Sequence, residues 1–248
     1  KETSAVTRSI AQNGAAGAAS AVVKSVEYQG RKASRQGSEQ RRQDILDAAM
    51  RIVVRDGVRA VRHRAVAAEA SVPLSATTYY FKDIDDLLTD AFSQYVERSA
   101  AYMAKLWEST EVTLREMVGR TDGTTAGRAR LADEIAFMSM EYIRHQLATR
   151  RDYLIAEHAF HCEALINPRL ARLVDAHQDI LLQGACRLLQ VMGSVQPLQD
   201  AQVLTGVMCR MEYQGLLHGP QPDADKENLG ILTRQMHLVL GTTKSVDE

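Results

Sequence analysis

The 248-residue sequence predicts an all-α fold, and two observations lead to this expectation. Aromatic residues make up only 5% of the chain while Ala and Leu are frequent, a balance that favours helices over sheets. Apolar residues recur three and four positions apart along most of the chain, and no stretch shows the alternation that is typical of strands. We therefore expect a chain of helices joined by short connections.

Charge is distributed unevenly along this chain. The whole sequence has a net charge of −1, yet residues 31–82 hold eleven Lys and Arg against five acidic residues, a net charge of +6. Residues 83–248 carry a net charge of −8. A basic N-terminal third on an acidic remainder is typical of a DNA-binding domain joined to a separate sensing or assembly domain. A solvated basic helix face would give the same charges.

Three segments of different composition predict the domain organisation. Residues 1–37 are rich in Ala, Gly, Ser and Gln and have weak apolar periodicity, which predicts a flexible basic N-terminal tail. Residues 38–84 are expected to form a helix-turn-helix DNA-binding domain. Residues 85–248 are expected to form a larger helical domain for effector binding and dimerisation.

Three helices are predicted in the DNA-binding segment, at residues 39–55, 62–70 and 74–80. Gly57 follows the first helix, where a C-cap requires a positive φ angle, and Pro73 ends the second. Two short helices joined by a tight turn, behind a first helix, are typical of a helix-turn-helix domain whose last helix enters the major groove.

The third predicted helix combines hydroxyl and aromatic side chains in one and a half turns. They belong to Ser75, Thr77, Thr78, Tyr79 and Tyr80. A buried helix would be apolar here, and an ordinary surface helix would be rich in Lys and Glu. Hydroxyl and aromatic groups instead suit contacts with phosphates and base edges.

A longer pattern runs without gaps from residue 41 to residue 88. Its residues are Ile45 to Ala49, Gly57, Val66, Ala67, Val72, Tyr79 to Lys82 and Asp85 to Leu88. This pattern resembles the N-terminal signature of TetR-family transcriptional regulators. The sequence departs from the family pattern at Arg62, Ser71, Thr78 and Ile84, which affects individual phosphate contacts rather than the fold.

The resemblance implies a set of contacts to double-stranded operator DNA. By matching position, groove-facing or base-reading roles fall to Arg64, Leu74, Ser75 and Tyr79. Thr78, Tyr80 and Lys82 match positions that contact phosphates. The basic arm that includes Arg41 and Arg42 is expected to enter the minor groove or to bind phosphates of the DNA backbone.

Arg64 is the sharpest of these expectations, because Arg to guanine is the commonest specific contact. Three alternatives stay open. Arg64 could pair with Glu69 or with a phosphate, Tyr80 and Phe81 could be core residues, and the arm could be a solvated tail.

The remaining chain predicts helices separated by short breaks. A fourth helix, capped by Asp83, is expected to end near residues 107–109, and a fifth to span residues 110–118. Further helices are expected at residues 127–148, 150–165, 167–192, 197–218 and 225–240.

The resemblance also implies a homodimer through the last two helices, at residues 197–218 and 225–240. Both helices have a broad apolar stripe, and Gly206 and Gly215 would allow close helix approach. A regulator that reads two symmetric half-sites needs a dimer as well. The same stripe would serve equally well as intrachain core.

A small apolar effector is expected to bind among the fourth to eighth helices. The candidate lining residues are Tyr102, Met103, Trp107, Phe137, Met138, Met140, Tyr142, Tyr153, His158, Phe160, His161 and Cys162. Methionines and aromatics at helical spacing are more often core than pocket, so core packing is the alternative for this set.

One group of side chains suggests a metal ion instead. His158, His161 and Cys162 share a helix face, and Glu157, Glu163 and His177 are other possible ligands. Such groups can hold Zn²⁺ or another transition metal. A structural zinc site needs four ligands, and no second Cys/His pair at short spacing supports one. We therefore predict no metal and no cofactor, and favour a polar pocket lining or a surface helix.

Cysteine usage and the absence of catalytic motifs narrow the functional class. Cys162, Cys186 and Cys209 are odd in number and widely spaced, which argues against a disulfide framework and predicts a cytoplasmic protein. No apolar run reaches the ~18 residues that span a bilayer. The sequence has no Gly-rich phosphate loop, nucleophile elbow or HExxH motif, so no enzyme is expected.

Together these features predict a ligand-responsive, sequence-specific regulator, a repressor that an effector releases from a palindromic operator. The first alternative is a helical adaptor of the same fold without specific DNA binding, which the departures at Arg62, Ser71 and Ile84 favour. The second alternative is a metal-binding helical enzyme.

Overall fold

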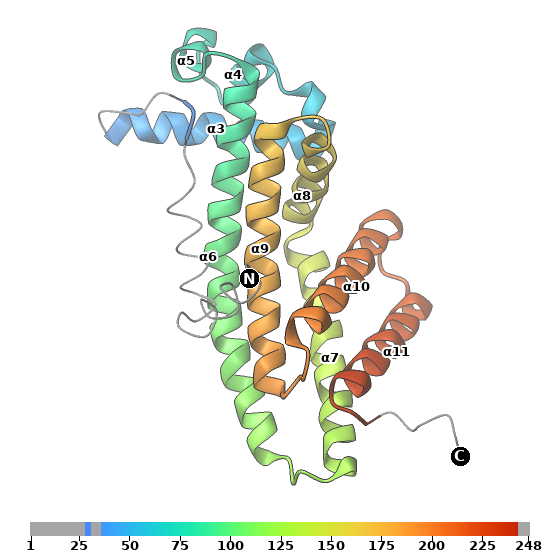
Figure 1. The fold of residues 1–248 in the computed structure, drawn as a ribbon. Helices are drawn as coiled ribbons and strands as arrows, with labels where there is room; N and C mark the ends of the chain where they lie inside the picture. Colours follow the sequence, from blue (N-terminus) through green and yellow to red (C-terminus); the bar gives the residue numbers. More distant parts are fainter. Residues whose placement is uncertain (1–27, 31–35, 243–248) are drawn as a thin grey trace. The chain divides into compact units, whose positions relative to one another are not determined.

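The computed structural model describes residues 28–30 and 36–242. Within these ranges there are nine α-helices, one short 3-10 helix and no strand, so the all-α prediction is confirmed (Figure 1). The elements are α3 (Gln36–Asp56), η1 (Val58–Ala60), α4 (His63–Glu69), α5 (Leu74–Tyr80), α6 (Ile84–Arg120), α7 (Thr125–Thr149), α8 (Arg151–Ala164), α9 (Pro168–Met192), α10 (Pro197–His218) and α11 (Pro222–Val239).

The chain divides into two compact units. The N-terminal unit contains the described residues 28–30, 36–101 and 155–178, and the C-terminal unit contains residues 102–154 and 179–242. The division therefore falls inside α6, α8 and α9. The functional boundary after residue 84 stays a prediction, and residues 1–27 and 31–35 of the predicted tail lie outside the described residues.

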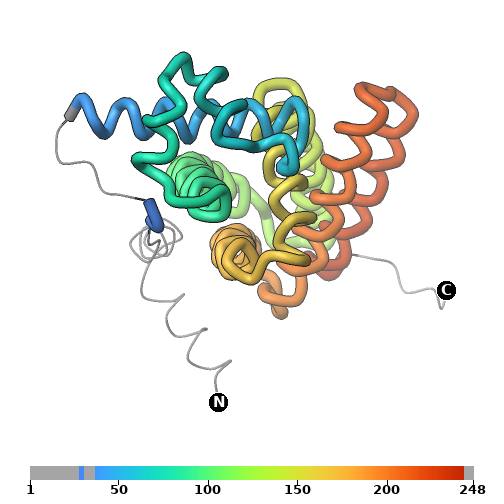
Figure 2. Tube along the Cα trace, turned by 90° about the horizontal axis from the view of Figure 1, so that it is seen from above, coloured from blue at the N-terminus to red at the C-terminus, as the bar shows by residue number. Residues whose placement is uncertain are grey.

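In the N-terminal unit, α3 crosses the first part of α6 (Figures 1 and 2). The apolar stripe of α3 is buried, as its helical spacing predicts: Ile45, Leu46, Ala49, Ile52 and Val53. The helix ends at Asp56, and Gly57 follows with a φ angle of 83°. The predicted glycine stop is thus confirmed, because a residue with a Cβ atom adopts this φ at a cost.

The helix-turn-helix forms as predicted, with α4 and α5 joined by residues 70–73. The amide of Val72 donates to the carbonyl of Ala67 at 3.0 Å, which closes the turn. Ser71 has a φ angle of 55°, the left-handed conformation that favours glycine. Ser71 is a position at which the TetR pattern often has glycine, so the turn keeps its shape here with a strained residue.

The long helix α6 corrects one prediction. We expected a break near residues 107–110, yet α6 is continuous for 37 residues. The Ser109 hydroxyl donates to the Leu106 carbonyl, and the Thr113 hydroxyl donates to the Ser109 carbonyl. Because the hydroxyls of Ser109 and Thr113 bond to carbonyls of their own helix, these polar residues do not interrupt α6.

Polar caps and prolines define other helix starts. The Asp83 carboxylate accepts from the Asp86 amide at 2.8 Å, so the predicted cap of α6 is confirmed, and the Asn167 side chain caps α9 in the same way by accepting from the Arg169 amide at 3.1 Å. Pro197 begins α10 as expected, while α11 begins at Pro222, three residues earlier than predicted. Proline suits the first helical turn, because the amide it lacks would be unpaired there.

The C-terminal unit packs α7, α10 and α11 together (Figure 1). Its core includes Met140 and Ile143 of α7, Met211 of α10, and Leu232 and Met236 of α11. Two glycines allow close helix packing inside this unit. A Cβ atom at Gly184 would overlap the Trp107 ring, and one at Gly215 would overlap Leu147. Gly215 therefore serves intrachain packing with α7, which corrects its predicted place between subunits.

In the described ranges, none of the helices combines the length and the apolar character that crossing a membrane requires.

Candidate DNA-binding surface and buried polar cluster

Helix α5 has one solvent-exposed face and one buried face. Leu74, Ser75, Thr78 and Tyr79 are exposed, and Tyr79 has a relative exposure of 55%. On the other side Thr77 is fully buried, and its hydroxyl donates to the Leu74 carbonyl at 2.9 Å. Leu74, Ser75 and Tyr79 are the α5 residues predicted to face the DNA groove, and Thr78 is predicted to contact a phosphate. Their contacts with DNA stay a prediction.

Tyr80 lies on the buried face of α5, and this corrects its predicted role as a phosphate contact. Its relative exposure is 5%, and its hydroxyl donates to the Ser38 carbonyl at 3.0 Å. The side chain thus joins α5 to the start of α3. Phe81 is also fully buried, so the core alternative applies to both residues.

Arg64, Lys82 and Arg41 all lie exposed in the N-terminal unit. The Glu69 carboxylate accepts from Arg51 at 2.8 Å and from Arg55 at 3.1 Å, and these two hydrogen bonds lower the pKa of Glu69. The proposed alternative for Arg64, a pair with Glu69, is therefore wrong. Among the residues that the structure describes, none forms a hydrogen bond or ion pair with the Arg64 guanidinium.

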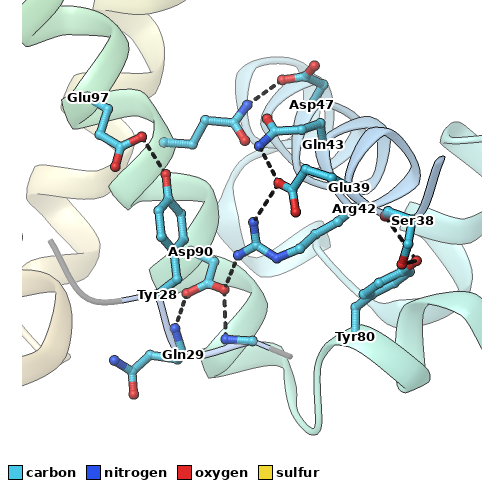
Figure 3. A network of polar contacts seen from close by, with 12 residues as sticks. Tyr28, Gln29, Ser38, Glu39, Arg42, Gln43, Asp47, Tyr80, Asp90 and Glu97 are labelled. Atoms are coloured by element: carbon cyan, nitrogen blue, oxygen red, sulfur yellow. Dashed lines mark hydrogen bonds and ion pairs between the residues drawn. The ribbon is translucent and has the colours of Figure 1, made fainter. Parts of the chain in front are cut away.

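Arg42 is buried, which corrects its predicted contact with DNA. Its Nη2 donates to Asp90 Oδ2 at 2.6 Å, and the two side chains are 5% and 0% exposed (Figure 3). Glu39 lies 3.7 Å from the same guanidinium. Because a buried charge needs a buried partner, Arg42 joins α3 to α6 and does not reach a phosphate.

The short segment from Tyr28 to Gly30 lies against α6 at the same place (Figure 3). The amides of Gln29 and Gly30 donate to the Asp90 carboxylate at 2.5 and 2.8 Å. The Tyr28 hydroxyl donates to Glu97, and the Arg42 guanidinium lies 4.7 Å from the Tyr28 ring centre. Burial, and then the hydrogen bond to Glu97, raise the pKa of Tyr28. These three residues therefore depart from the predicted flexible tail.

Asp47 makes a second polar link between α3 and α6. Its Oδ1 accepts from Gln94 Nε2 and from Arg98 Nη1, both at 2.6 Å. Together with the Arg42–Asp90 pair, it fixes how α3 lies on α6.

The candidate effector-pocket residues are divided between the two units. Those in the C-terminal unit are Tyr102, Met103, Trp107, Phe137, Met138, Met140, Tyr142 and Tyr153. Phe137 is 56% exposed, so it does not line the interior of its unit, and Met140 belongs to the core. The Arg150 guanidinium lies 3.6 Å from the Tyr102 ring centre and 4.3 Å from the Tyr153 ring centre. The other residues keep their pocket role as a prediction.

The candidates in the N-terminal unit are His158, Phe160, His161 and Cys162. Phe160 is fully buried and stacks on Phe92 at 4.3 Å between ring centres. Cys162 is exposed, so it does not share an interior with Phe160. His161 is partly buried and faces Glu157 of the same helix.

A partly buried polar cluster lies next to this aromatic stack. Glu157 and His161 of α8 meet His177 of α9, with one ligand atom from each residue within 4.8 Å of the others. Burial lowers the pKa of His161 and of His177, which is fully buried, so both imidazoles are neutral near pH 7. The spacing of Glu157 and His161 was visible in the sequence, but the approach of His177 depends on how α8 and α9 pack.

Two residues of α6 complete the cluster. The Tyr95 hydroxyl donates to Glu157 Oε2 at 2.8 Å, and the Ser99 hydroxyl lies at hydrogen-bond distance from His177 Nε2, also at 2.8 Å. Sequence reasoning missed both residues, because a lone Tyr and a lone Ser on an amphipathic helix are no signal by themselves.

Comparison with solved structures identifies the family. No family model matches the chain. A member of the TetR family from Streptomyces coelicolor A3 is 30% identical, with a TM-score of 0.50, and the match covers 79% of this chain and 98% of that one. The chain belongs to the TetR family. The resemblance seen in the sequence is thereby confirmed, and with it a helix-turn-helix transcriptional regulator of the TetR type.

Other relatives agree with this placement. The multidrug binding protein EbrR, complexed with imidazole, is 28% identical with a TM-score of 0.51, and the match covers 79% of this chain and 89% of that one. A TetR-family protein from Mesorhizobium loti, 14% identical, shares the fold, with a TM-score of 0.53 and coverage of 84% and 98%.

A third relative matches over a shorter segment. The nicotine-responsive transcriptional repressor HdnoR of Paenarthrobacter nicotinovorans is 31% identical over 71 residues. These are 29% of this chain and only 37% of the length of HdnoR.

Proposed function

We propose that this TetR-family chain is a ligand-responsive repressor that binds a palindromic operator as a homodimer. The observation that carries the proposal is the exposed polar face of α5, which is held in place by its buried face. Residues 38–84 bind DNA in this proposal, and residues 85–248 bind the effector and the partner subunit. The relatives named as a multidrug binding protein and a nicotine-responsive repressor support a response to small molecules.

DNA reading falls to the exposed residues of α4 and α5. Arg64 would read a base, and Leu74, Ser75 and Tyr79 would face the groove. Thr78, Lys82 and Arg41 would hold phosphates, which gives affinity without sequence preference. Arg42 and Tyr80 instead hold α3, α5 and α6 together, so their role is to position the reading helix.

Helix α6 is the element that would couple an effector to this surface. Asp90, Gln94 and Arg98 lie on the side of α6 that bonds to α3. Tyr95 and Ser99 lie about a third of a turn further around the helix and bond to the polar cluster of Glu157, His161 and His177. An effector that binds one position of α6 better than another would shift α3 and the helices packed on it, and so change the separation of the two reading helices.

The homodimer would use the exposed faces of α10 and α11. Val203, Gly206, Arg210, Tyr213 and Leu217 are all exposed, and their spacing of three and four residues places them on one face of α10.

The exposed face of α11 has the same character. It contains Gly230 and Leu238, and the Cβ positions of Gly206 and Gly230 have open space around them. The larger apolar residues of the predicted stripes, among them Met211 and Leu232, are intrachain core. A second copy of this chain is thus the occupant that we propose for the exposed faces.

The dimer surface is tested by a pair of matched variants. The double variant Leu217→Glu/Leu238→Glu should be a monomer with native helix content, because each subunit would bury two unpaired charges in the interface. The control is Val112→Glu on α6, because Val112 has a relative exposure of 55% against 57% for Leu217. If the double variant keeps the dimer mass by light scattering, the proposed interface is wrong.

The regulator proposal as a whole is tested by selection from randomised duplex DNA with the purified full chain. We expect enrichment of a two-fold symmetric site with half-sites about one helical turn apart. Enrichment of no sequence would favour the helical adaptor. We further propose that the protein is cytoplasmic and is not an enzyme, in keeping with the relatives that are described as regulators.

A further inference from the structure

Three side chains that commonly bind metals converge inside the N-terminal unit. Glu157 and His161 are one helical turn apart on α8, and His177 reaches them from α9. Glu157 Oε1 and His161 Nε2 are 4.0 Å apart, and one ligand atom from each of the three residues lies within 4.8 Å of the others. The Glu157 carboxylate faces His161 with Oε1, while its other oxygen, Oε2, accepts from the Tyr95 hydroxyl.

The imidazoles offer lone pairs that nothing in the described part of the chain uses. His161 Nε2 and His177 Nδ1 are both buried and have no hydrogen-bond partner among the described residues. His177 is fully buried, and an imidazole nitrogen that holds no proton can act as a metal ligand. A buried polar atom without a partner costs free energy, so such atoms point to a missing group.

Contacts from α6 orient two of the three ligands. Tyr95 donates to Glu157 Oε2, which leaves Oε1 toward His161. The Ser99 hydroxyl can accept from His177 Nε2–H, which places the imidazole lone pair on Nδ1. Hydrogen bonds to the far side of a carboxylate or an imidazole are the usual support of metal ligands.

We propose that Glu157, His161 and His177 form a binding site for a divalent first-row transition metal ion of the zinc class. Two imidazoles and one carboxylate select Zn²⁺, Co²⁺ or Ni²⁺ over Mg²⁺ and Ca²⁺, which prefer all-oxygen sites. Three protein ligands leave a fourth position open for water or for a donor atom of a bound molecule.

The three ligand atoms must move closer together when the ion binds. With metal–ligand distances of 2.0–2.1 Å, tetrahedral ligand atoms are about 3.3 Å apart. Glu157 and His161 have side chains that are 18% and 22% exposed, so they have room to rotate inward.

These ligands differ from the His158, His161 and Cys162 group that the sequence suggested. His161 is common to the two groups, but Cys162 is exposed and His158 lies outside the cluster. A metal site is not part of the proposed repressor function. It is tested by ion binding in the absence of DNA, so its failure would leave the regulator proposal intact.

The test uses tag-free full-length protein stripped of metal with a chelator. We expect one Co²⁺ per chain with visible d–d absorption of a four- or five-coordinate ion, and displacement of Co²⁺ by Zn²⁺ in calorimetry. Mg²⁺ should not compete. At a Zn²⁺ concentration 100 times Kd, Tm should rise by roughly 5–10 °C. Absence of saturable one-to-one binding of either ion would overturn the proposal.

Variants distinguish this site from adventitious binding. Glu157→Gln and His177→Gln should each lower the affinity by at least about 100-fold, and Ser99→Ala by about 10–100-fold, with a changed Co²⁺ spectrum. His158→Ala and Cys162→Ser are the matched controls and should bind as the parent does. If His177→Gln lowers the Tm of the metal-free protein, its loss of affinity could come from altered folding. The assignment then depends on the affinity of Glu157→Gln, which is nearly isosteric with the parent. Loss of binding in the controls, or full binding by Glu157→Gln, would contradict the assignment.

Discussion

Arg42 of α3 and Asp90 of α6 form an ion pair of 2.6 Å in which neither side chain is more than 5% exposed. The same Asp90 carboxylate accepts from the amides of Gln29 and Gly30. One acidic side chain of α6 thus joins three segments of the N-terminal unit: α6 itself, α3 and residues 28–30.

Removal of Asp90 should therefore destabilise the protein. We expect Asp90→Ala to lower the free energy of unfolding by about 3–5 kcal/mol, because Arg42 would stay buried without a counter-charge. Asp85→Ala on the same helix is the control, since Asp85 is exposed and its loss should cost less than about 1 kcal/mol. Urea unfolding followed by circular dichroism measures both, and equal effects of the two substitutions would contradict the role of Asp90.

Arg64 and Lys82 should differ in how their loss affects DNA binding. Arg64→Ala should cost about 1–3 kcal/mol at a single base position of the operator and relax specificity there. Lys82→Ala should weaken binding to all sequences alike and reduce the salt slope by about 1. Both effects are measured by titrating the protein with single-base variants of the operator at several salt concentrations, which gives the affinity for each sequence and its salt dependence. Uniform loss across all sequences in both variants would show that Arg64 does not read a base.

Ser71 should accept glycine with a gain in stability. Its φ angle of 55° costs a residue with a Cβ atom about 1–2 kcal/mol, part of which is offset because glycine makes the unfolded chain more flexible. We expect Ser71→Gly to raise the free energy of unfolding by up to about 1 kcal/mol, and Ser71→Ala to bring no gain. A loss of stability in the glycine variant would mean that the Ser71 side chain supports the turn.

Tyr80 and Tyr79 are neighbours with different expected roles. Tyr80→Phe should lower the free energy of unfolding by about 0.5–1.5 kcal/mol, because the hydrogen bond to the Ser38 carbonyl is lost, and should leave the salt slope of DNA binding unchanged. Tyr79→Phe should change stability less than Tyr80→Phe does, since Tyr79 is exposed. A reduced salt slope in Tyr80→Phe would restore the phosphate contact that the sequence suggested.

The fold could be predicted from the sequence wherever local chemistry decides it. The span of α5, the stop at Gly57 and the caps Asp83 and Asn167 all follow from short-range propensities. The continuity of α6 could not, because the hydroxyls of Ser109 and Thr113 support a helix or a break depending on which carbonyl they bond.

The sites were less predictable, since burial is decided by packing between distant segments. Arg42 belongs to a basic run in the sequence, and only the approach of Asp90, 48 positions away, turns it into a buried ion pair. His177 joins Glu157 and His161 for the same reason, because α9 packs beside α8. Residue type gave the chemistry of these side chains, and tertiary structure gave their partners.

The most direct test of the regulator proposal is the affinity of the full chain for its selected operator and for a scrambled duplex, at two salt concentrations. The account predicts binding of the operator by a dimer about 10³-fold or more tighter than binding of the scrambled DNA, with a steep salt dependence for both. Equal, weak affinity for the two duplexes would contradict it and would favour a helical adaptor of the TetR fold.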